Sequence, residues 1–397
     1  MPEVPALFRQ VLASTHKDIH LDAWRLDGSQ VPDSGSAGWS IAKRTLHGGR
    51  QEGVDVVEID NGQLRITVIP TRGMSILKVE SQDLRLGWDS PVKEVIHPQY
   101  INLESRGGLG WLEGFNEWLV RCGLEWAGHP GPDSFRNNVG EQVEMNLTLH
   151  GKIGNIPASE VEVSMDVQAP HRIHLRGLVE ERMFYGAKLS LWTDISTEPG
   201  SNSFRIEDVV INSGSHDQEF QLIYHANFGP PLLQAGSQFV GAMDQIMPFN
   251  KRAAENVADF DQYWEPRRDF IEQVYCLRPI AGPDGLGAIM LQNEHQNRGV
   301  LMSFPVQQLP CVTFWKNLAA IEDGYVTGLE PGTGFPYTRR IERAANRVPK
   351  LAPHEKRTFT IDVSLLHNPA SVNAARQRIR AIQNDVQPLI LAPPSNQ

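Results

Sequence analysis

Short runs of strand-forming residues, separated by turn residues, recur along almost the whole chain. The runs are rich in β-branched and aromatic residues, and many turns follow one another at intervals of about ten residues. In the run 203–212, Phe204, Ile206 and Val210 alternate with polar neighbours, which is the pattern of a half-buried strand. This spacing favours an all-β sandwich or barrel-like stack over repeated βαβ units. The expected strands are 54–59, 64–69, 75–80, 141–150, 161–167, 173–180, 188–197, 203–212, 219–225, 271–277, 286–292, 299–304, 311–316, 325–330 and 356–365.

Helical patterns are confined mainly to the two ends of the chain. Residues 5–13 are expected to form a first helix. The clearest helix is expected over 370–384, where Val372, Ala375 and Ile379 fall near helical spacing.

The middle of the chain has no convincing linker and no repeat of fixed period. Residues 244–266 are polar, acidic and poor in strand signals, so we expect an excursion or lid over the sheet. We expect one large β domain over 46–368. An N-terminal extension, 1–45, is expected to pack on this domain, and a C-terminal helix and tail, 369–397, to follow it.

Composition narrows the classes of partner. The formal net charge of −10 argues against a nucleic-acid surface and makes attraction to anionic membranes weak. The three cysteines, Cys122, Cys276 and Cys311, are widely separated and have no zinc-site spacing. The amino terminus lacks the basic start and apolar core of a secretory signal. We therefore expect a cytoplasmic protein with a small-molecule partner and no membrane contact; the number of subunits stays open, a homodimer included.

Three glycine-bordered stretches each place one titratable side chain beside a strand-like run. They are LHGKIGN (149–155), YHANFG (224–229) and GLEPGTGFP (328–336), and they contain His150, His225 and Glu330. Histidine exchanges protons near neutral pH, and a partly buried glutamate can be tuned to do the same. Because no metal or nucleotide motif lies nearby, the set indicates proton shuttling on a polar neutral molecule, most simply a sugar.

These stretches, with PTRGMSI (70–76) and VRCGLEWAG (120–128), follow one another in an order that resembles the galactose mutarotase-like (aldose 1-epimerase) superfamily. More closely, the chain resembles a divergent branch known mainly as a domain family of unknown function. The resemblance implies a supersandwich of antiparallel sheets with a few peripheral helices. It also implies a groove on one concave face that holds a sugar.

The resemblance further implies roles for the three side chains. His225 matches the general acid, Glu330 matches the general base, and His150 looks like the histidine that binds the sugar and its ring oxygen. The implied activity is that of a cofactor-free, metal-free aldose 1-epimerase or a related sugar epimerase. The Asn-Arg pair that classical mutarotases carry ahead of the first histidine has no equivalent at matching spacing, so the identity of the sugar stays open.

Further substrate-binding candidates come from the side chains themselves. Trp315 offers a flat apolar platform for the C–H face of a pyranose, or it belongs to the core. Lys316 and Asn317 can supply polar contacts from the same run, and an ammonium suits a carboxylate or phosphate. Arg72 can grip an anionic or hydroxyl group, or it pairs with a carboxylate of the protein.

Three alternatives remain at this point. The chain can be a carbohydrate-binding or sensing protein without turnover, or a lyase or hydrolase that acts on an acidic or keto sugar. A metal held by His150, His225 and Glu330 is chemically sensible but less favoured than a metal-free site.

Overall fold

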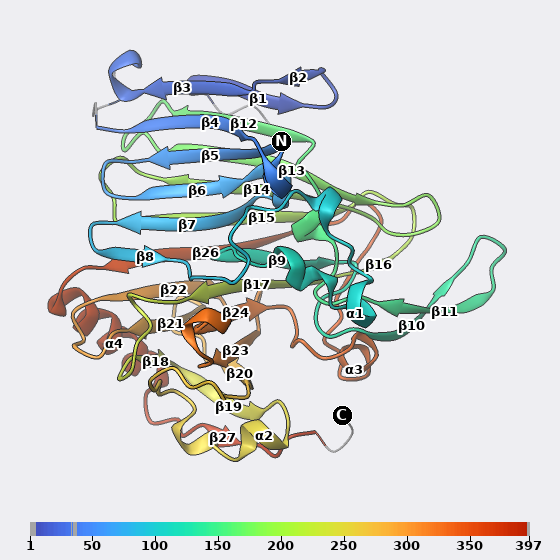
Figure 1. The fold of residues 1–397 in the computed structure, drawn as a ribbon, viewed down its shortest axis with the longest axis vertical. Coiled ribbons are helices and arrows are strands. Elements are labelled where there is room, and N and C mark those ends of the chain that lie inside the picture. The colour runs from blue at the N-terminus through green and yellow to red at the C-terminus, as the bar shows by residue number, and fades with distance from the viewer. Residues whose placement is uncertain (1–4, 33, 35–37, 395–397) are drawn as a thin grey trace.

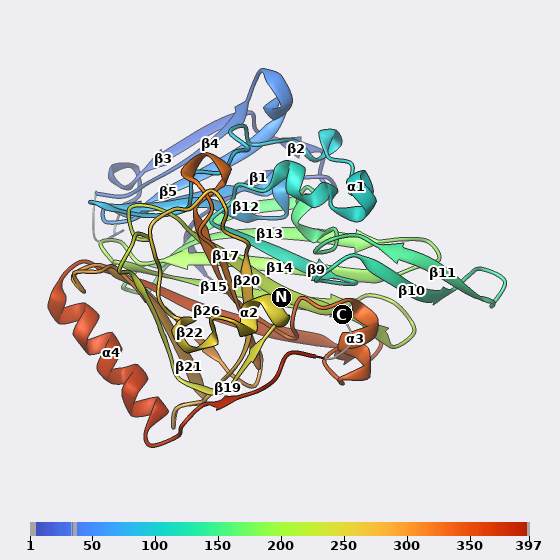
Figure 2. The same ribbon diagram turned by 60° about the horizontal axis from the view of Figure 1, so that its bottom comes forward.

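Two large, mainly antiparallel sheets face each other across the main hydrophobic core (Figures 1 and 2). The structure is a computed structural model, and it describes residues 5–32, 34 and 38–394. The core contains buried side chains of both sheets, such as Leu175 and Ile206 from one and Ile66 and Tyr224 from the other. The predicted all-β class is therefore confirmed.

Within the described residues, the first sheet has ten strands. In spatial order they are β18 (Gln238–Gly241), β21 (Leu286–Gln292), β22 (Gly299–Pro305), β26 (Lys356–Leu366), β15 (Ser203–Asn212), β14 (Lys188–Thr197), β13 (Ile173–Arg182), β12 (Glu160–Asp166), β1 (Ala6–Ser14) and β2 (Ile19–His20).

The second sheet has thirteen strands in the same described part of the chain. In spatial order they are β27 (Leu389–Ile390), β19 (Met243–Pro248), β20 (Gln273–Pro279), β23 (Cys311–Asn317), β24 (Val326–Gly332), β17 (Gln221–Phe228), β9 (Leu119–Leu124), β7 (Ser75–Ser81), β6 (Arg65–Ile69), β5 (Val54–Asp60), β4 (Ser40–Leu46) and β3 (Ala23–Asp27), with β8 (Leu84–Leu86) paired to β7.

Several smaller elements lie outside the two large sheets. The hairpin of β10 (Gly131–Arg136) and β11 (Gln142–Leu147) projects from the body at the right of Figure 1. Strands β16 (Gln218–Glu219) and β25 (Lys350–Leu351) form a separate pair. The α-helices within the described residues are α1 (Ser105–Gly108), α2 (Lys251–Ala254), α3 (Arg339–Ala344) and α4 (Pro369–Gln383).

Local sequence predicts several elements well. The strands expected at 188–197, 203–212 and 286–292 are confirmed at both ends as β14, β15 and β21. The helix expected at 370–384 is confirmed as α4, and the Asn368 side chain caps it by accepting a hydrogen bond from the Ser371 amide at 2.9 Å.

Two expectations need correction. The helix expected at 5–13 is wrong, because this segment forms β1 and pairs with β12, a partner about 150 residues away that its local pattern does not reveal. The segment 244–266 is not free of strands, since β19 covers its start and pairs with β20; only the part after Pro248 leaves the sheet.

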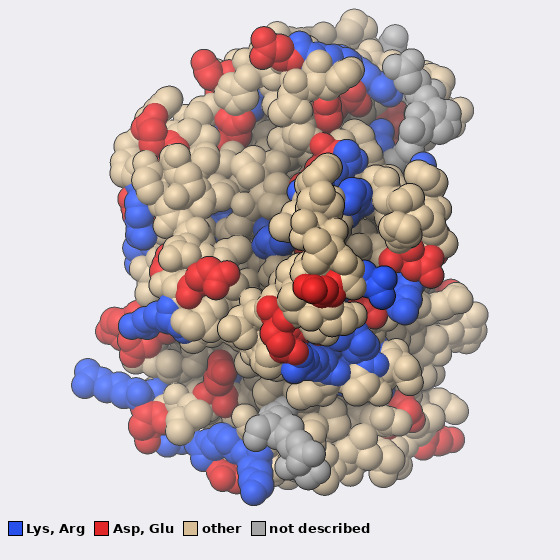
Figure 3. Space-filling view, turned by 90° about the vertical axis from the view of Figure 1, so that its right-hand side faces the viewer, with Lys and Arg blue, Asp and Glu red and all other residues tan. Residues whose placement is uncertain are grey.

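The outside of the molecule is mixed in charge where Figure 3 shows it. Acidic and basic side chains are interspersed over that face, and neither sign forms a continuous patch. Of the helices in the described residues, none combines the length and apolar character needed to cross a bilayer.

Candidate active site

A cavity of about 710 Å³ opens on the face of the second sheet that points away from the main core. Strands β17, β23 and β24 form its floor, and the segments 88–92 and 106–115 form part of its wall. Its lining residues include Trp88, Arg106, Trp111, Phe115, His129, His150, His225, Glu272, Thr313, Trp315, Asn317, Asp323 and Glu330.

Strand alternation decides which side chains reach this cavity. On β17, Tyr224 and Ala226 point into the main core, so His225 between them points to the opposite face. On β24, Leu329 lies in the core and Glu330 follows it into the cavity. The two chemical groups therefore emerge on the same face of adjacent strands.

His225 and Glu330 lie side by side across the β17–β24 pair. The register that pairs Ala226 with Leu329 puts His225 opposite Glu330. The His225 Nε2 and Glu330 Oε1 atoms are 3.3 Å apart, and both side chains are almost completely buried. A proton can pass between these groups and a small molecule that contacts both.

Asn227, the next residue on the same face of β17, orients the imidazole. Its Oδ1 lies 2.7 Å from Nδ1 of His225, and its Nδ2 donates to the carbonyl of Glu117 at 3.1 Å. Because the amide nitrogen is held in this way, the oxygen is left to accept the Nδ1–H of the ring. Nε2 then faces Glu330 with its lone pair or its acidic proton.

Burial drives the two pKa values towards the neutral forms. Desolvation lowers the pKa of His225 to about 4, although the hydrogen bond with Asn227 acts in the opposite direction. Desolvation, followed by the charge of Glu272, raises the pKa of Glu330 well above its ordinary value. Both shifts favour the state in which the imidazole is neutral and the carboxyl carries the one transferable proton.

His150 approaches the same pair from a tight turn. Its ring centroid is 5.3 Å from that of His225 and 4.7 Å from that of Trp111. Burial lowers the pKa of His150 well below its usual value, so the ring is neutral. Its buried Nδ1 has no hydrogen-bond partner within the described part of the chain and is available to a ligand.

The turn that carries His150 requires the glycine after it. Gly151 has a positive φ of 73°, and a Cβ there would collide with the carbonyl oxygens of Gly123 and Trp126. The backbone of His150 is also fixed, because its amide donates to the carbonyl of Gly128 at 2.8 Å. The HG pair in LHGKIGN thus has a local structural cause.

Aromatic rings build much of the wall around the pair. The ring centroids of Trp315 and His225 are 5.5 Å apart, and those of Trp315 and Phe115 are 6.1 Å apart. The indole Nε1 of Trp315 donates to Glu272 at 2.8 Å, which fixes the ring plane. Flat apolar faces next to carboxyl and imidazole groups suit a sugar ring, which has both C–H and O–H surfaces.

The structure does not bring all the predicted binding residues to this cavity. Trp315 and Asn317 line it, whereas Lys316 lies between them in sequence and therefore points to the other face of β23. Lys316 is buried, 4.0 Å from the Trp264 ring centroid and 3.2 Å from the carbonyl of Phe260. Desolvation lowers the pKa of this lysine to about 7.

Arg72 also lies away from the cavity. Its guanidinium is buried against Glu117, at 2.8 Å, and donates to the carbonyls of Ile96, Gly114 and Gly154. All of these partners belong to the protein, so Arg72 acts here as a cross-link beneath the segment that supplies Phe115.

Sequence reasoning missed several lining residues and one orienting residue. Asn227 lies two positions after His225, and period-two spacing along β17 was a usable signal for it. The other missed lining residues come from segments without a recognisable site motif; they are Trp111, Phe115, His129 and Glu272.

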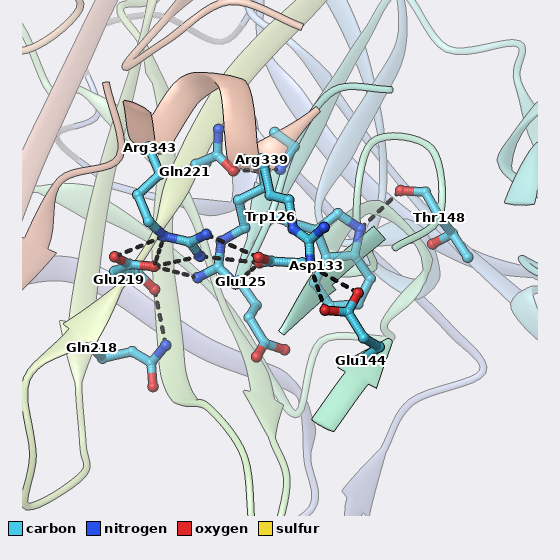
Figure 4. Close-up of polar contacts among 12 residues, drawn as sticks. Glu125, Trp126, Asp133, Glu144, Thr148, Gln218, Glu219, Gln221, Arg339 and Arg343 are labelled. Carbon is cyan, nitrogen blue, oxygen red and sulfur yellow. Dashed lines mark hydrogen bonds and ion pairs between the residues drawn. The ribbon is translucent and has the colours of Figure 1, made fainter. Parts of the chain in front are cut away.

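An ionic network fastens the projecting hairpin to the body (Figure 4). Asp133 of β10 accepts from Arg339 at 3.1 Å and from Arg343 at 2.9 Å, and Arg343 also bonds Glu219. At the surface, Arg340 bonds Glu144 of β11 at 2.7 Å. Helix α3, which supplies the three arginines, thus holds both strands of the hairpin.

This network is connected along the chain to two residues that line the cavity, His129 and Pro336. The strand that carries Glu330 leads through Pro336 into α3. The backbone amide of His129 donates to the carbonyl of Pro336 at 2.9 Å. Trp126, in the same segment, donates to the carbonyl of Thr148 at 2.8 Å, beside His150 (Figure 4). The segment 126–129 is therefore tied to both walls of the site.

Among the described residues, no group of three or more histidine, cysteine, aspartate or glutamate side chains is arranged to hold a metal ion.

Comparisons with known proteins agree with this fold. Residues 51–365 match a family described as a domain of unknown function, DUF4432. No curated protein matches the chain. A crystal structure from Klebsiella pneumoniae subsp. pneumoniae, provisionally named an aldose 1-epimerase, is 40% identical with a TM-score of 0.91 and covers 98% of this chain and 99% of that chain.

More distant structures share the fold alone. A galactose mutarotase-like protein of Clostridium acetobutylicum is 11% identical with a TM-score of 0.55, over 87% of this chain and 99% of that one. A galactose 1-epimerase of Lactobacillus acidophilus is 12% identical with a TM-score of 0.50, over 83% and 99%.

Proposed function

The chain belongs to the DUF4432 family and has a galactose mutarotase-like fold, and on this premise we propose that it is an aldose 1-epimerase. The observation that carries the proposal is the buried pair of His225 and Glu330, whose Nε2 and Oε1 atoms are 3.3 Å apart at the floor of the cavity. The provisional name of the Klebsiella protein supports the same reaction class.

The reaction needs two proton transfers, one at each of the two oxygens bonded to C1. The C1 hydroxyl loses a proton while the ring oxygen gains one, the ring opens, the C1–C2 bond rotates, and closure gives the other anomer. Because both oxygens are bonded to C1, two adjacent side chains can each reach one of them. In this proposal Glu330, as carboxylate, takes the hydroxyl proton, and His225, as imidazolium, protonates the ring oxygen.

The protonation state that burial favours fits one stage of this cycle. After ring opening, Glu330 holds the proton of the former C1 hydroxyl and His225 is neutral, which is the form towards which their pKa values are shifted. During closure, Glu330 returns its proton to the aldehyde oxygen. The hydroxyl formed from the ring oxygen attacks C1 and gives its proton to His225. The pair carries the same single proton throughout, so a full turnover consumes none.

The rest of the cavity supports the binding of a sugar. His150 lines the same space with an Nδ1 that has no hydrogen-bond partner among the described residues, and Trp315 presents an indole face held by Glu272. We propose that His150 binds a sugar oxygen and that Trp315 stacks on the ring.

Saturation-transfer NMR on a panel of aldoses and sugar acids tests the proposal. On the best substrate, His225→Ala and Glu330→Gln should each lower the anomerisation rate by roughly 10²–10⁴-fold. Asp323→Asn is the matched control, because this carboxylate lines the cavity and has no part in the proposed proton transfers, and it should cost far less. Full rates in both catalytic variants would refute the assignment. Tight sugar binding without acceleration for any aldose would instead favour a binding or sensing protein.

A further inference from the structure

A second cavity, of about 390 Å³, lies beneath helix α4 and shares no lining residue with the first. Its wall combines α4 with strands β18 and β19, the segment around Phe260, and the tail that leads to β27. Figure 2 shows α4 along the outside of the sheets, with the C-terminal segment turning back beside β19. Nothing in the proposed anomerisation uses this space.

Two arginines of α4 face the cavity from successive helical turns. Arg376 and Arg380 are four residues apart, so their side chains lie on the same helix face. Within the described residues neither guanidinium has an ion pair or a hydrogen-bonded partner, and Nη2 of Arg376 is fully buried. Arg378, on another face of the same helix, does have partners: Ser303 at 3.1 Å and Asp284 at 3.7 Å.

Among the described residues, no carboxylate forms an ion pair with the guanidinium of Arg376 or of Arg380. Desolvation lowers the pKa of Arg376, and the nearby charge of Arg380 lowers it further. Asp261 is the one carboxylate that lines the cavity within the described part of the chain, and its Oδ2 already accepts from Gln238 at 3.2 Å. Arg376 is partly buried, and its buried Nη2 lacks a hydrogen-bond partner among the described residues, so an anionic ligand between the two guanidinium groups would be stabilised.

The remaining lining is apolar. Phe239, Met243, Ile246 and Phe260 form a hydrophobic floor, and Val386 and Pro388 of the tail close one side. The cavity thus has two arginine side chains next to an apolar surface. Its volume lies within the range of small-molecule binding sites.

We propose that this cavity binds a small organic phosphate, with its phosphate between Arg376 and Arg380 and its carbon skeleton against Phe260. Tetrahedral phosphate offers several oxygens, so two guanidinium groups on adjacent helical turns can each take a separate oxygen. The apolar floor favours a ligand with a ring or carbon chain over inorganic phosphate. This inference is independent of the proposed sugar chemistry.

Isothermal titration calorimetry on the full chain tests this site with phenyl phosphate, inorganic phosphate, benzoate and phenol. We expect one phenyl phosphate per chain, bound more tightly than inorganic phosphate or benzoate, and no measurable binding of neutral phenol. Arg376→Gln and Arg380→Gln should each weaken phenyl phosphate at least tenfold. Arg378→Gln removes the same charge from the same helix outside the cavity and should leave the affinity unchanged, as should His225→Ala.

Several results would overturn the inference. These are the absence of phenyl phosphate binding at millimolar concentration, equal affinity in Arg376→Gln and the unmodified chain, or an equal loss in Arg378→Gln. Tighter binding of benzoate would overturn the phosphate assignment. If Arg376→Gln does not fold, Arg380→Gln decides the question, because Arg380 is exposed and its loss leaves no buried gap.

Discussion

Replacing His225 with glutamine should remove a specific part of the pH dependence of stability. In the folded chain, burial lowers the pKa of His225 from 6.5 to about 4. Between these two pH values the unfolded chain binds a proton at His225 and the folded chain does not. The stabilisation is therefore fully present above pH 6.5 and is lost as the pH falls towards 4. Since one pKa unit corresponds to about 1.4 kcal/mol, the loss is roughly 3 kcal/mol.

Urea unfolding followed by tryptophan fluorescence, at a series of pH values from 7.5 to 4, measures this effect. Glutamine has no proton to gain, so the unfolding free energy of His225→Gln should fall less steeply on acidification. The difference between the two chains should change by roughly 3 kcal/mol across that range. The same comparison in a Glu330→Gln background should give a similar change, because desolvation and not Glu330 is the main cause. A difference that stays constant with pH would show that the folded chain protonates His225 as readily as the unfolded chain.

Two further predictions concern other buried charges. The raised pKa of Glu330 means that the folded chain keeps a proton that the unfolded chain releases above pH 4.5, so stability is lost as the pH rises. Glu330→Gln should therefore gain stability relative to the unmodified chain, by up to about 1.4 kcal/mol for each pH unit above 4.5, in the same urea series; a pH-independent difference would contradict this. Arg72→Met should destabilise the fold by about 3–5 kcal/mol, because it leaves Glu117 buried without its partner. Calorimetric unfolding at pH 7 measures this loss, and Arg72→Met with Glu117→Gln should recover part of it; a loss below about 1 kcal/mol would count against the cross-link.

Local patterns in the sequence were sufficient for much of the fold. Strands β14, β15 and β21 have the expected ends, and both ends of helix α4 lie one residue from the expected ones, since alternation, turn residues and a capping asparagine act over a few neighbouring residues. The segment 5–13 was misread because its state depends on pairing with β12, and no nearby residue records that partner. The local conformational preference of a segment contributes less free energy than a full set of cross-strand contacts.

The candidate site also combines features that the sequence predicts with features that only the tertiary structure determines. The sequence by itself determined which chemical groups the chain carries, and the order of its motifs pointed to a sugar-active fold. Only the tertiary structure decided that His225 and Glu330, 105 residues apart, become neighbours through one strand register. It also sent Trp315 and Lys316 to opposite faces of β23, and it closed Arg72 onto Glu117. The physical reason is that a pKa, a contact or a cavity depends on which distant segments exclude water from a group, and sequence neighbours do not contain that information.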